Sequence, residues 1–394
     1  MRVLHVMTAF PRNESDVIAP WLVEMLVRMR ARGVEVEVLT SSYKGMGNQV
    51  TRGIPVYRFR YFPARWENLT HEETAPDRMR KSLLYRIMPA FYVAAGMVAA
   101  WRIARKGRYD IVHVHWPMPH ALFAWSAQRA AGPRVVATFY SVEVRWISRG
   151  IPALKAFLRW TISFPDRAVA ISSTTASEIR TIASVPVDVI PYTIALPPAA
   201  PAAAPQGQTR LLFVGRLVER KGVDVLLRAI ASLTDLHALR LVVVGDGPEM
   251  ATLVALASEL GVAGRVEFVG RVSDERLRQE YALASMFVLP AIVDARGDTE
   301  GLGVVLLEAM NSRIPVIASD AGGIVDIVEH EKTGLLVPPG DVFALAGAIR
   351  RLASDGPKAK ALGEAGYRRL VERFSWDSII DRWLAIYDQV LDRR

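Results

Sequence analysis

The sequence contains no cysteine in its 394 residues. This absence excludes disulfide bonds, thiolate metal sites and a cysteine nucleophile. It suits a reducing compartment, and it equally suits a thermophile that avoids labile residues. Charged residues make up 23% against 51% hydrophobic residues, so pervasive disorder is excluded and a globular protein is expected. The length exceeds that of one ordinary core and predicts two domains.

The sequence also lacks a recognisable signal peptide and a long hydrophobic run. Residues 1–6 show no basic segment followed by a long apolar one. The longest uncharged run, residues 87–101, is shorter than the roughly 18 apolar residues of a spanning helix, and Pro89 and Gly96 interrupt it. We therefore expect a buried or interfacial helix at this place and a cytoplasmic protein.

Positive charge is present in excess. The net charge of +9 favours an acidic partner, namely a phosphate-bearing substrate, an anionic membrane surface or nucleic acid. A basic surface that only keeps the protein soluble would give the same net charge. Because the sequence has no basic run and no nucleic-acid motif, we expect no nucleic-acid partner.

Short apolar strands alternate with helical patterns along the whole chain. Several strands are continuously apolar, as in parallel sheets covered on both faces, and the intervening helices predict a doubly wound α/β fold. A first helix is expected at residues 17–30. Strands are expected at residues 3–7, 34–39, 54–59, 111–114, 135–138, 168–171 and 187–190, and then at residues 211–214, 241–244, 266–269, 287–289 and 316–318.

A Pro/Ala-rich break divides the chain. Residues 1–193 are expected to form a Rossmann-like domain, residues 194–209 a semi-stiff linker, and residues 210–372 a second Rossmann-like domain. Residues 373–394 contain an amphipathic helix that we expect to cross back to the first domain. Because ligands of open α/β sheets bind beyond the carboxyl ends of the strands, the residues there are candidates, in a cleft between the domains.

Two cationic side chains follow the first strand of the second half. Arg216 and Lys221 lie around a helix start, where the helix dipole and the cationic donors favour an anion. A solvated basic loop is an equally good interpretation of this pair. The pattern is not a phosphate loop of the Walker type, which needs Gly-x-x-x-x-Gly-Lys.

The most informative motif runs from Glu300 to Glu308. Its two glycines allow a ligand to approach backbone N–H groups at the start of a helix. Eight residues of helix rise about 12 Å, which would place both glutamates on similar faces at different depths. Glu308 lies in an apolar run, where an unpaired carboxylate is costly, so a binding role is favoured over an ordinary surface helix. The motif predicts a site for a phosphate-bearing activated donor such as a nucleotide sugar.

Several motifs in the second half occur in order at characteristic spacing. They are Gly215-Arg216-Leu217, Lys221-Gly222, Glu300 with Glu308, Gly322-Gly323 and residues 334–337. Together they resemble the family-4 group of retaining glycosyltransferases, whose two Rossmann-like domains form the GT-B fold. The first half is similar to the family at its first strand, at Pro11, and at residues 113–116 and 189–191. The resemblance covers nearly the whole chain.

The resemblance implies a role for each matching residue. Arg216 and Lys221 contact the donor diphosphate, Glu308 binds the ribose hydroxyls, and Val272 lies near the base. The family needs no cofactor and no catalytic metal, because cationic side chains and helix dipoles offset the charge of the leaving group. The donor is then a UDP-, GDP- or ADP-linked sugar. Glu300 lies at the donor sugar near the reacting carbon, and the backbone of Gly301, Leu302, Gly303 and Val304 holds sugar and phosphate oxygens.

Two places in the first half depart from the family pattern. Many relatives carry His-Gly after the strand that ends near Phe139, whereas this chain has Tyr140 and Ser141. That histidine lies near the donor sugar, so its role is either absent here or taken over by Tyr140, which both donates and accepts hydrogen bonds. Many relatives also have a Gly-Gly loop after the first strand, and here residues 11–16 contain no glycine.

The remaining features of the first half concern the acceptor. His113, His115 and His120 cluster near a strand end, where contacts within the protein or to an acceptor are favoured over a metal. Residues 58–108 are rich in arginine and aromatic side chains. Such a surface suits an anionic membrane and a lipid-linked acceptor. The alternative, that residues 87–104 form a core helix of the first domain, is the preferred interpretation.

The sequence therefore predicts an enzyme of polysaccharide or glycolipid biosynthesis. It would move a hexose-type sugar from a nucleotide sugar to a hydroxyl of a sugar-containing or lipid-linked acceptor with retention of configuration. Same-face attack within an ion pair and a covalent intermediate both remain open. The alternatives are a nucleotide-sugar epimerase on the same fold and a non-catalytic nucleotide-binding protein.

Overall fold

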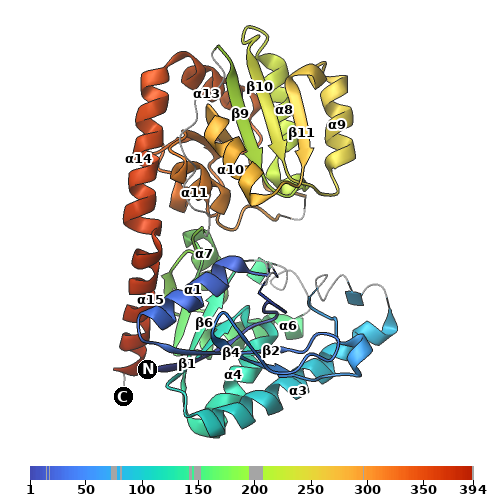
Figure 1. Ribbon diagram of the computed structural model, residues 1–394, viewed down its shortest axis with the longest axis vertical. Coiled ribbons are helices and arrows are strands. Elements are labelled where there is room, and N and C mark those ends of the chain that lie inside the picture. The colour runs from blue at the N-terminus through green and yellow to red at the C-terminus, as the bar shows by residue number, and fades with distance from the viewer. Residues whose placement is uncertain are drawn as a thin grey trace. The chain divides into compact units, whose positions relative to one another are not determined.

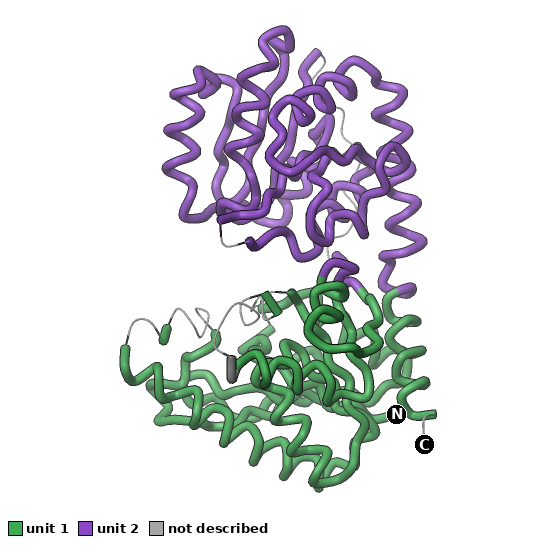
Figure 2. Tube along the Cα trace, turned by 180° about the vertical axis from the view of Figure 1, so that it is seen from behind, with its two compact units in different colours: residues 1–171, 175–190, 379–394 green, residues 172–174, 191–378 purple. Residues whose placement is uncertain are grey.

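A computed structural model describes residues 1–14, 16, 18–71, 78–79, 82–141, 144–145, 152–194, 207–295 and 297–392. The chain divides into two compact units, which Figure 2 shows in different colours. Most of the expected linker, residues 195–206, lies outside the described residues. Unit 1 contains Met1–Ile171, Thr175–Ile190 and Ile379–Arg394, and unit 2 contains Ser172–Thr174 and Pro191–Ser378.

Unit 1 is built on an eight-stranded sheet with the strand order β3-β4-β2-β1-β5-β6-β7-β8 (Figure 1). All neighbouring strands pair in parallel except β3 and β4, which are antiparallel. The strands are β1 (Arg2–Val6), β2 (Glu35–Ser41), β3 (Gln49–Thr51), β4 (Ile54–Phe59), β5 (Ile111–His115), β6 (Arg134–Phe139), β7 (Arg167–Ala170) and β8 (Val187–Val189).

Helices connect these parallel strands, as right-handed crossovers require. They are α1 (Pro20–Ala31), the 3-10 turn η1 (Ala64–Trp66), α3 (Leu83–Gly107), α4 (Pro117–Ala131), α6 (Pro152–Ser163) and α7 (Ser173–Ile182). The last helix of the chain, α15 (Trp376–Leu391), buries one stripe of side chains. Its Tyr387 hydroxyl hydrogen-bonds His113 Nδ1 on β5 at 2.7 Å, so the end of the chain belongs to the core of unit 1.

Unit 2 carries a six-stranded, wholly parallel sheet with the order β11-β10-β9-β12-β13-β14. Its strands are β9 (Thr209–Val214), β10 (Leu239–Val244), β11 (Val266–Gly270), β12 (Met286–Leu289), β13 (Val316–Ser319) and β14 (Leu335–Val337). Its helices are η2 (Glu219–Lys221), α8 (Val223–Ser232), α9 (Met250–Glu259), η3 (Ala263–Arg265), α10 (Asp274–Leu283), α11 (Val304–Asn311), α12 (Ile324–Ile327), α13 (Val342–Ser354) and α14 (Gly356–Phe374).

The predicted fold class is confirmed. Each strand expected from the sequence is present, with ends that differ by at most two residues. Two strands were not expected, the short β3 and β14. The first helix begins at Pro20 rather than near residue 17, because Ala19 adopts a left-handed conformation with φ 45° and proline then occupies the first helical turn.

Helix α3 differs from the preferred interpretation as a core helix. It is one continuous helix of 25 residues that includes Pro89, and only one face packs against the core, through Met88, Tyr92, Gly96, Ala100 and Ala104. Gly96 permits this contact because a Cβ there would lie 2.1 Å from the Phe123 ring of α4. By length and composition α3 could span a membrane, which is weak evidence on its own, and 22% of its most apolar window is buried.

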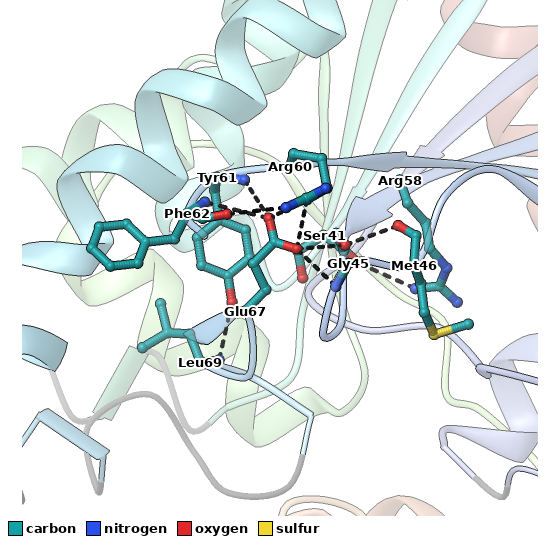
Figure 3. A network of polar contacts seen from close by, with 10 residues as sticks. Ser41, Gly45, Met46, Arg58, Arg60, Tyr61, Phe62, Glu67 and Leu69 are labelled. Carbon is teal, nitrogen blue, oxygen red and sulfur yellow. Dashed lines mark hydrogen bonds and ion pairs between the residues drawn. The ribbon is translucent and has the colours of Figure 1, made fainter. Parts of the chain in front are cut away.

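A buried carboxylate fixes the chain segment that precedes α3 (Figure 3). Glu67 accepts hydrogen bonds from Ser42 Oγ at 2.8 Å, from Gly45 N at 3.0 Å and from Tyr61 N at 2.9 Å. Arg60 Nε completes the set at 2.8 Å, so the fully buried side chain of Glu67 has a cationic partner. A buried charge is stable only with such partners, and the network therefore ties residues 42–45 to residues 60–67.

Candidate functional site

The centre of the candidate site in unit 2 is a buried ion pair. Lys221 Nζ lies 2.5 Å from Glu300 Oε2, and Arg220 Nη1 lies 3.4 Å from the same oxygen. The side chains of Lys221 and Glu300 are 10% and 12% exposed. Lys221 ends the η2 turn that follows β9, and Glu300 lies in the loop that follows β12, so adjacent strands of the sheet bring them together.

Glu300 is ionised in this environment. Burial by itself would raise the pKa of Glu300, but the neighbouring cations Lys221 and Arg220 lower it more, and the net pKa lies below the usual value. An ionised carboxylate only accepts hydrogen bonds. Glu300 is therefore suited to accept hydrogen bonds from hydroxyl groups of a ligand while Lys221 supplies positive charge beside it.

Two glycines after β13 hold the Glu300 loop in place. A Cβ on Gly322 would lie 2.0 Å from the Glu300 carbonyl oxygen, and the φ of Gly322 is +56°. A Cβ on Gly323 would lie 2.2 Å from the Gly301 carbonyl oxygen, and Gly323 N donates to the Glu300 carbonyl at 3.0 Å. The glycines thus serve a close approach of two segments of the chain's own backbone.

The helix that follows begins later than expected. Helix α11 starts at Val304, after Gly303 in the left-handed region with φ 86°, and no side chain caps its first N–H groups. Glu300 consequently lies in the loop before the helix, so the prediction that both glutamates share a helix face is wrong. The structural reason is the left-handed conformation at Gly303, which only glycine adopts readily. The amino end of α11 still favours an anion.

Glu308 lies one turn into α11 and has a partner that the sequence did not reveal. Tyr281 of α10, itself 2% exposed, donates its hydroxyl to Glu308 Oε2 at 2.7 Å. Burial raises the pKa of Glu308, and the hydrogen bond from Tyr281 offsets part of this increase. Because Tyr281 follows β11 and is far from Glu308 in sequence, only the packing of α10 against α11 brings them together.

The other expected donor residues also follow strands of unit 2. Arg216 is exposed directly after β9, Val272 is half-buried just beyond β11, and Leu302 is buried in the loop before α11. Gly301, Gly303 and Val304 complete that loop and the start of the helix. Arg220 was not expected to contact Glu300, and its position beside Lys221 was the only available signal. Of the expected catalytic residues, Tyr140 is in unit 1.

Tyr140 lies directly after β6 and is held by buried histidines. Its hydroxyl hydrogen-bonds His115 Nδ1 at 2.8 Å, and His115 Nε2 lies 3.1 Å from His5 Nδ1 on the neighbouring strand β1. On β5, His113 Nε2 contacts Thr138 Oγ1 at 2.7 Å. Burial lowers the pKa of His113 and His115 well below the usual range, so both imidazoles are neutral.

The same histidines are a geometric candidate for a metal ion, since His5, His113 and His115 place ligand atoms within 4.8 Å of one another. Both nitrogens of His113 and of His115 are already engaged, however, with Tyr387, Thr138, Tyr140 and His5, and His5 Nδ1 is engaged with His115. His5 Nε2 has no hydrogen-bond partner within the described residues. His120 is likewise held, by the Tyr92 hydroxyl at 2.9 Å. Contacts within the protein, one of the two alternatives favoured from the sequence, therefore account for most of the cluster.

The loop at residues 11–16, which departs from the family pattern, is described except for Ser15. Arg12 Nε forms an ion pair with Asp16 Oδ2 at 2.6 Å, and the Arg12 guanidinium lies 5.0 Å from the ring centroid of Tyr43. Arg58, which is buried, donates to the Pro11 carbonyl at 2.8 Å. Side-chain contacts therefore hold the described part of this loop, which contains no glycine.

Comparisons with known proteins find similarity in both halves of the chain. The profile of the glycosyl transferases group 1 family matches residues 199–369, and the profile of the glycosyl transferase 4-like domain matches residues 18–193. The GDP-mannose-dependent alpha-(1-6)-phosphatidylinositol monomannoside mannosyltransferase of Mycobacterium tuberculosis is 35% identical over 279 residues, which cover 66% of this chain and 71% of the relative.

Solved structures share the fold at low sequence identity. Sucrose-phosphate synthase from Thermosynechococcus elongatus superposes with a TM-score of 0.77 and 22% identity, over 100% of both chains. The HepE protein of Anabaena in complex with UDP superposes with a TM-score of 0.73 and 17% identity, over 99% of this chain and 100% of the other.

Proposed function

The chain belongs to the glycosyl transferases group 1 family and is a glycosyltransferase of the GT-B type, and we propose that it transfers a sugar from a nucleoside diphosphate to an acceptor hydroxyl with retention of configuration. The observation that carries the proposal is the Lys221–Glu300 pair, because it places an ionised carboxylate and a cation at 2.5 Å in a buried setting beside the uncapped start of α11.

Each part of this site suits one part of a nucleotide sugar. The uncapped amino end of α11 and the cations Arg216 and Lys221 favour the diphosphate. Glu300 accepts hydrogen bonds from hydroxyls of the sugar. Glu308, which Tyr281 orients, accepts hydrogen bonds from the ribose hydroxyls. Val272, just beyond β11, contacts the base.

The chemical contribution of these residues is electrostatic. When the bond between the anomeric carbon and the diphosphate breaks, negative charge grows on the departing phosphate oxygens. Arg216, Lys221 and the α11 dipole stabilise that charge, so we infer that transfer proceeds without a metal ion or a cofactor. Glu300 holds the sugar in place, the acceptor oxygen bonds to the anomeric carbon, and the acceptor proton passes to the departing diphosphate.

A thermal-shift screen against UDP-, GDP- and ADP-sugars identifies the donor, because a ligand that binds only the folded state raises the unfolding temperature. We expect one nucleotide to stabilise the protein selectively. Arg216→Ala and Glu308→Ala should each weaken its binding in calorimetric titration, whereas Phe343→Ala, a change at an 84% exposed side chain of α13, should not. Unchanged affinity in both site variants contradicts the assignment, and conversion of the donor without any acceptor indicates an epimerase.

We further propose that the acceptor is lipid-linked and that α3 contacts an anionic membrane. The exposed large apolar side chains of α3 recur at helical spacing and cover one stripe. They are Leu83 (74% exposed), Ile87 (54%), Phe91 (52%), Val98 (48%) and Trp101 (40%). Phe62, from the segment fixed by Glu67, extends this stripe with its ring 5.5 Å from that of Phe91.

The charges on and around α3 are consistent with contact to an anionic membrane. No acidic residue occurs between Asp77 and Asp110, while Arg86, Arg102 and Arg105 are exposed on α3. Each basic residue near an anionic lipid surface contributes about 1 kcal/mol of attraction. An apolar stripe with a basic border is the pattern of a helix that lies in the membrane interface.

Co-sedimentation with vesicles tests the membrane contact. The protein should bind phosphatidylglycerol vesicles, bind phosphatidylcholine vesicles far more weakly, and lose binding as salt increases. Phe91→Glu should reduce binding roughly tenfold or more, since a charge replaces an inserted ring. Phe343→Glu in unit 2 is the matched control and should bind like the wild type. Equal binding to both lipids, or no effect of Phe91→Glu, refutes the contact.

A further inference from the structure

Three aromatic side chains gather where adjacent strands of unit 1 end. Trp116 directly follows β5, Tyr140 directly follows β6, and Trp21 lies in the first turn of α1, the helix after β1. The rings of Trp116 and Tyr140 are stacked with centroids 4.4 Å apart, and Trp21 lies 5.3 Å from Tyr140 and 6.1 Å from Trp116. We call Trp21, Trp116 and Tyr140 the aromatic trio.

Hydrogen bonds to buried histidines fix the Tyr140 ring of the aromatic trio. The Tyr140 hydroxyl is fixed by His115 Nδ1 at 2.8 Å, and the buried neutral His115 is fixed in turn by His5 at 3.1 Å. Trp21 and Trp116 are half-buried, so each keeps part of its ring at the surface. A fixed ring presents its face to a ligand without the entropy cost of ordering a mobile side chain.

The backbone beside the trio is strained. Ala19, Trp116 and Ser141 have φ angles of 45°, 51° and 81° although none is glycine. Each such residue costs about 1–3 kcal/mol, and strain of this kind clusters at functional sites. Three of them occur within two residues of the three aromatic positions, on three separate segments of the chain.

One polar group beside the trio lacks a partner. Ser141, next to Tyr140, is 1% exposed, and its hydroxyl has no hydrogen bond within the part of the chain that the structure describes. A buried hydroxyl without a partner is unfavourable by about 1–3 kcal/mol. A ligand hydroxyl at this edge of the sheet would remove that cost, which distinguishes the edge from an ordinary aromatic cluster.

We propose that the aromatic trio binds the ring of the acceptor, and that the acceptor therefore presents a pyranose or cyclitol ring rather than an open-chain polyol. The C–H groups of a six-membered ring form an apolar face that packs flat on an aromatic ring, while the ring hydroxyls at its edge hydrogen-bond polar groups such as Ser141. An open chain has no flat C–H face. This inference rests on the proposed sugar transfer, and it assigns the class of acceptor.

Saturation-transfer NMR on the full chain tests the inference without any turnover. The probes are methyl α-mannopyranoside and myo-inositol, with mannitol as the open-chain counterpart. We expect at least one ring probe to bind and mannitol not to bind. Trp116→Leu and Trp21→Leu should weaken ring binding roughly tenfold or more, Trp116→Phe should retain most of it, and Trp125→Leu, at a half-buried tryptophan of α4, should have no effect.

The variants must also separate binding from folding. An unchanged urea-unfolding transition, followed by far-ultraviolet circular dichroism, identifies variants whose unit 1 remains folded, and Trp116→Phe tests the trio even where the leucine variants unfold. Equal binding of mannitol, or leucine variants that bind like the wild type, overturns the inference. If the wild type binds ring probes but turns over no nucleotide sugar, the proposed sugar transfer fails while the ring site stands.

Discussion

Replacement of Lys221 by methionine removes the positive charge that neutralises Glu300 without removing much volume. The Nζ–Oε2 distance is 2.5 Å and both side chains are about nine-tenths buried. Removal of one partner from a buried pair destabilises a protein by about 3–5 kcal/mol. Arg220 remains 3.4 Å from the same oxygen and is 33% exposed, so part of the charge is still neutralised. We therefore expect a loss at the lower end, about 3 kcal/mol.

Urea unfolding of Lys221→Met measures this loss, with an internal control in the tryptophans. Trp376 is the only tryptophan whose position falls in unit 2, so tryptophan fluorescence reports mainly on unit 1 and far-ultraviolet circular dichroism reports on both units. The circular-dichroism transition should shift to lower urea while the fluorescence transition moves less. The double variant Lys221→Met/Glu300→Gln should recover about 1–3 kcal/mol relative to the sum of the single changes.

The pH dependence follows from the lowered pKa of Glu300. A lowered carboxyl pKa contributes stability above the unfolded value of 4.5, and this contribution is lost as the pH falls through the folded pKa. The difference between wild type and Lys221→Met should therefore be largest near neutral pH and narrow in acid. A loss below about 1 kcal/mol, additive single changes, or a constant difference down to acid pH refutes the buried pair.

Three further perturbations test other contacts. Tyr281→Phe removes the hydrogen bond that lowers the pKa of Glu308, so the pKa of Glu308 should rise further. Nucleotide affinity should fall about tenfold, and as the pH is lowered its decline should begin at a higher pH than in the wild type. Unchanged calorimetric titration curves contradict this prediction. Gly322→Ala should abolish nucleotide binding because its Cβ would lie 2.0 Å from the Glu300 carbonyl, whereas Gly340→Ala, with positive φ but no atom within 4 Å, should only lose about 1 kcal/mol of stability. The free energy of unfolding of unit 1 should decrease as the pH falls below 6.5, by up to about 1.4 kcal/mol per pH unit for each buried neutral histidine. A free energy of unfolding, measured by fluorescence, that stays constant down to pH 4 contradicts this prediction. Those histidines are His5, with a pKa lowered to about 3, His120, lowered to about 4, and His113 and His115.

The sequence was sufficient to predict the fold because its signals are local. Continuous apolar runs identified the parallel strands, and the alternation with helices identified the doubly wound architecture. The short strands β3 and β14 were missed because three residues are too few for a periodic pattern. The helix expected at residues 87–104 is longer in the structure, where it begins at Leu83 after the capping residue Ser82 and ends at Gly107.

Residue pairs that depend on packing could not be predicted. The sequence suggested Lys221 and Glu300 as separate contacts of a donor, but their mutual pairing depends on the adjacency of β9 and β12. The contact of Tyr281 with Glu308 joins two helices and leaves no motif. The start of α11 was misplaced because Gly303 was considered only as space for a ligand, and its left-handed φ of 86° also ends the loop.

The aromatic trio shows the same limit. Trp21, Trp116 and Tyr140 lie on three separate segments of the sequence. Tyr140 and residues 113–116 were each noted in the sequence, but without being related to each other or to Trp21. Their common place is given by the strand order β1-β5-β6, which brings the carboxyl ends of the three strands to one edge. The departure from His-Gly at Tyr140 and Ser141 was visible in the sequence, but the contact of Tyr140 with His115 was not.

The most direct test of the central claim is sugar transfer by the purified chain. The wild type is incubated with the nucleotide sugar that stabilises it and with a ring acceptor, in the presence of a chelator, and the product is analysed by proton NMR. We predict release of the nucleoside diphosphate in step with a glycoside that keeps the donor's anomeric configuration, and loss of this activity in Glu308→Ala but not in Phe343→Ala. An inverted product, or a wild-type rate in Glu308→Ala, contradicts the account.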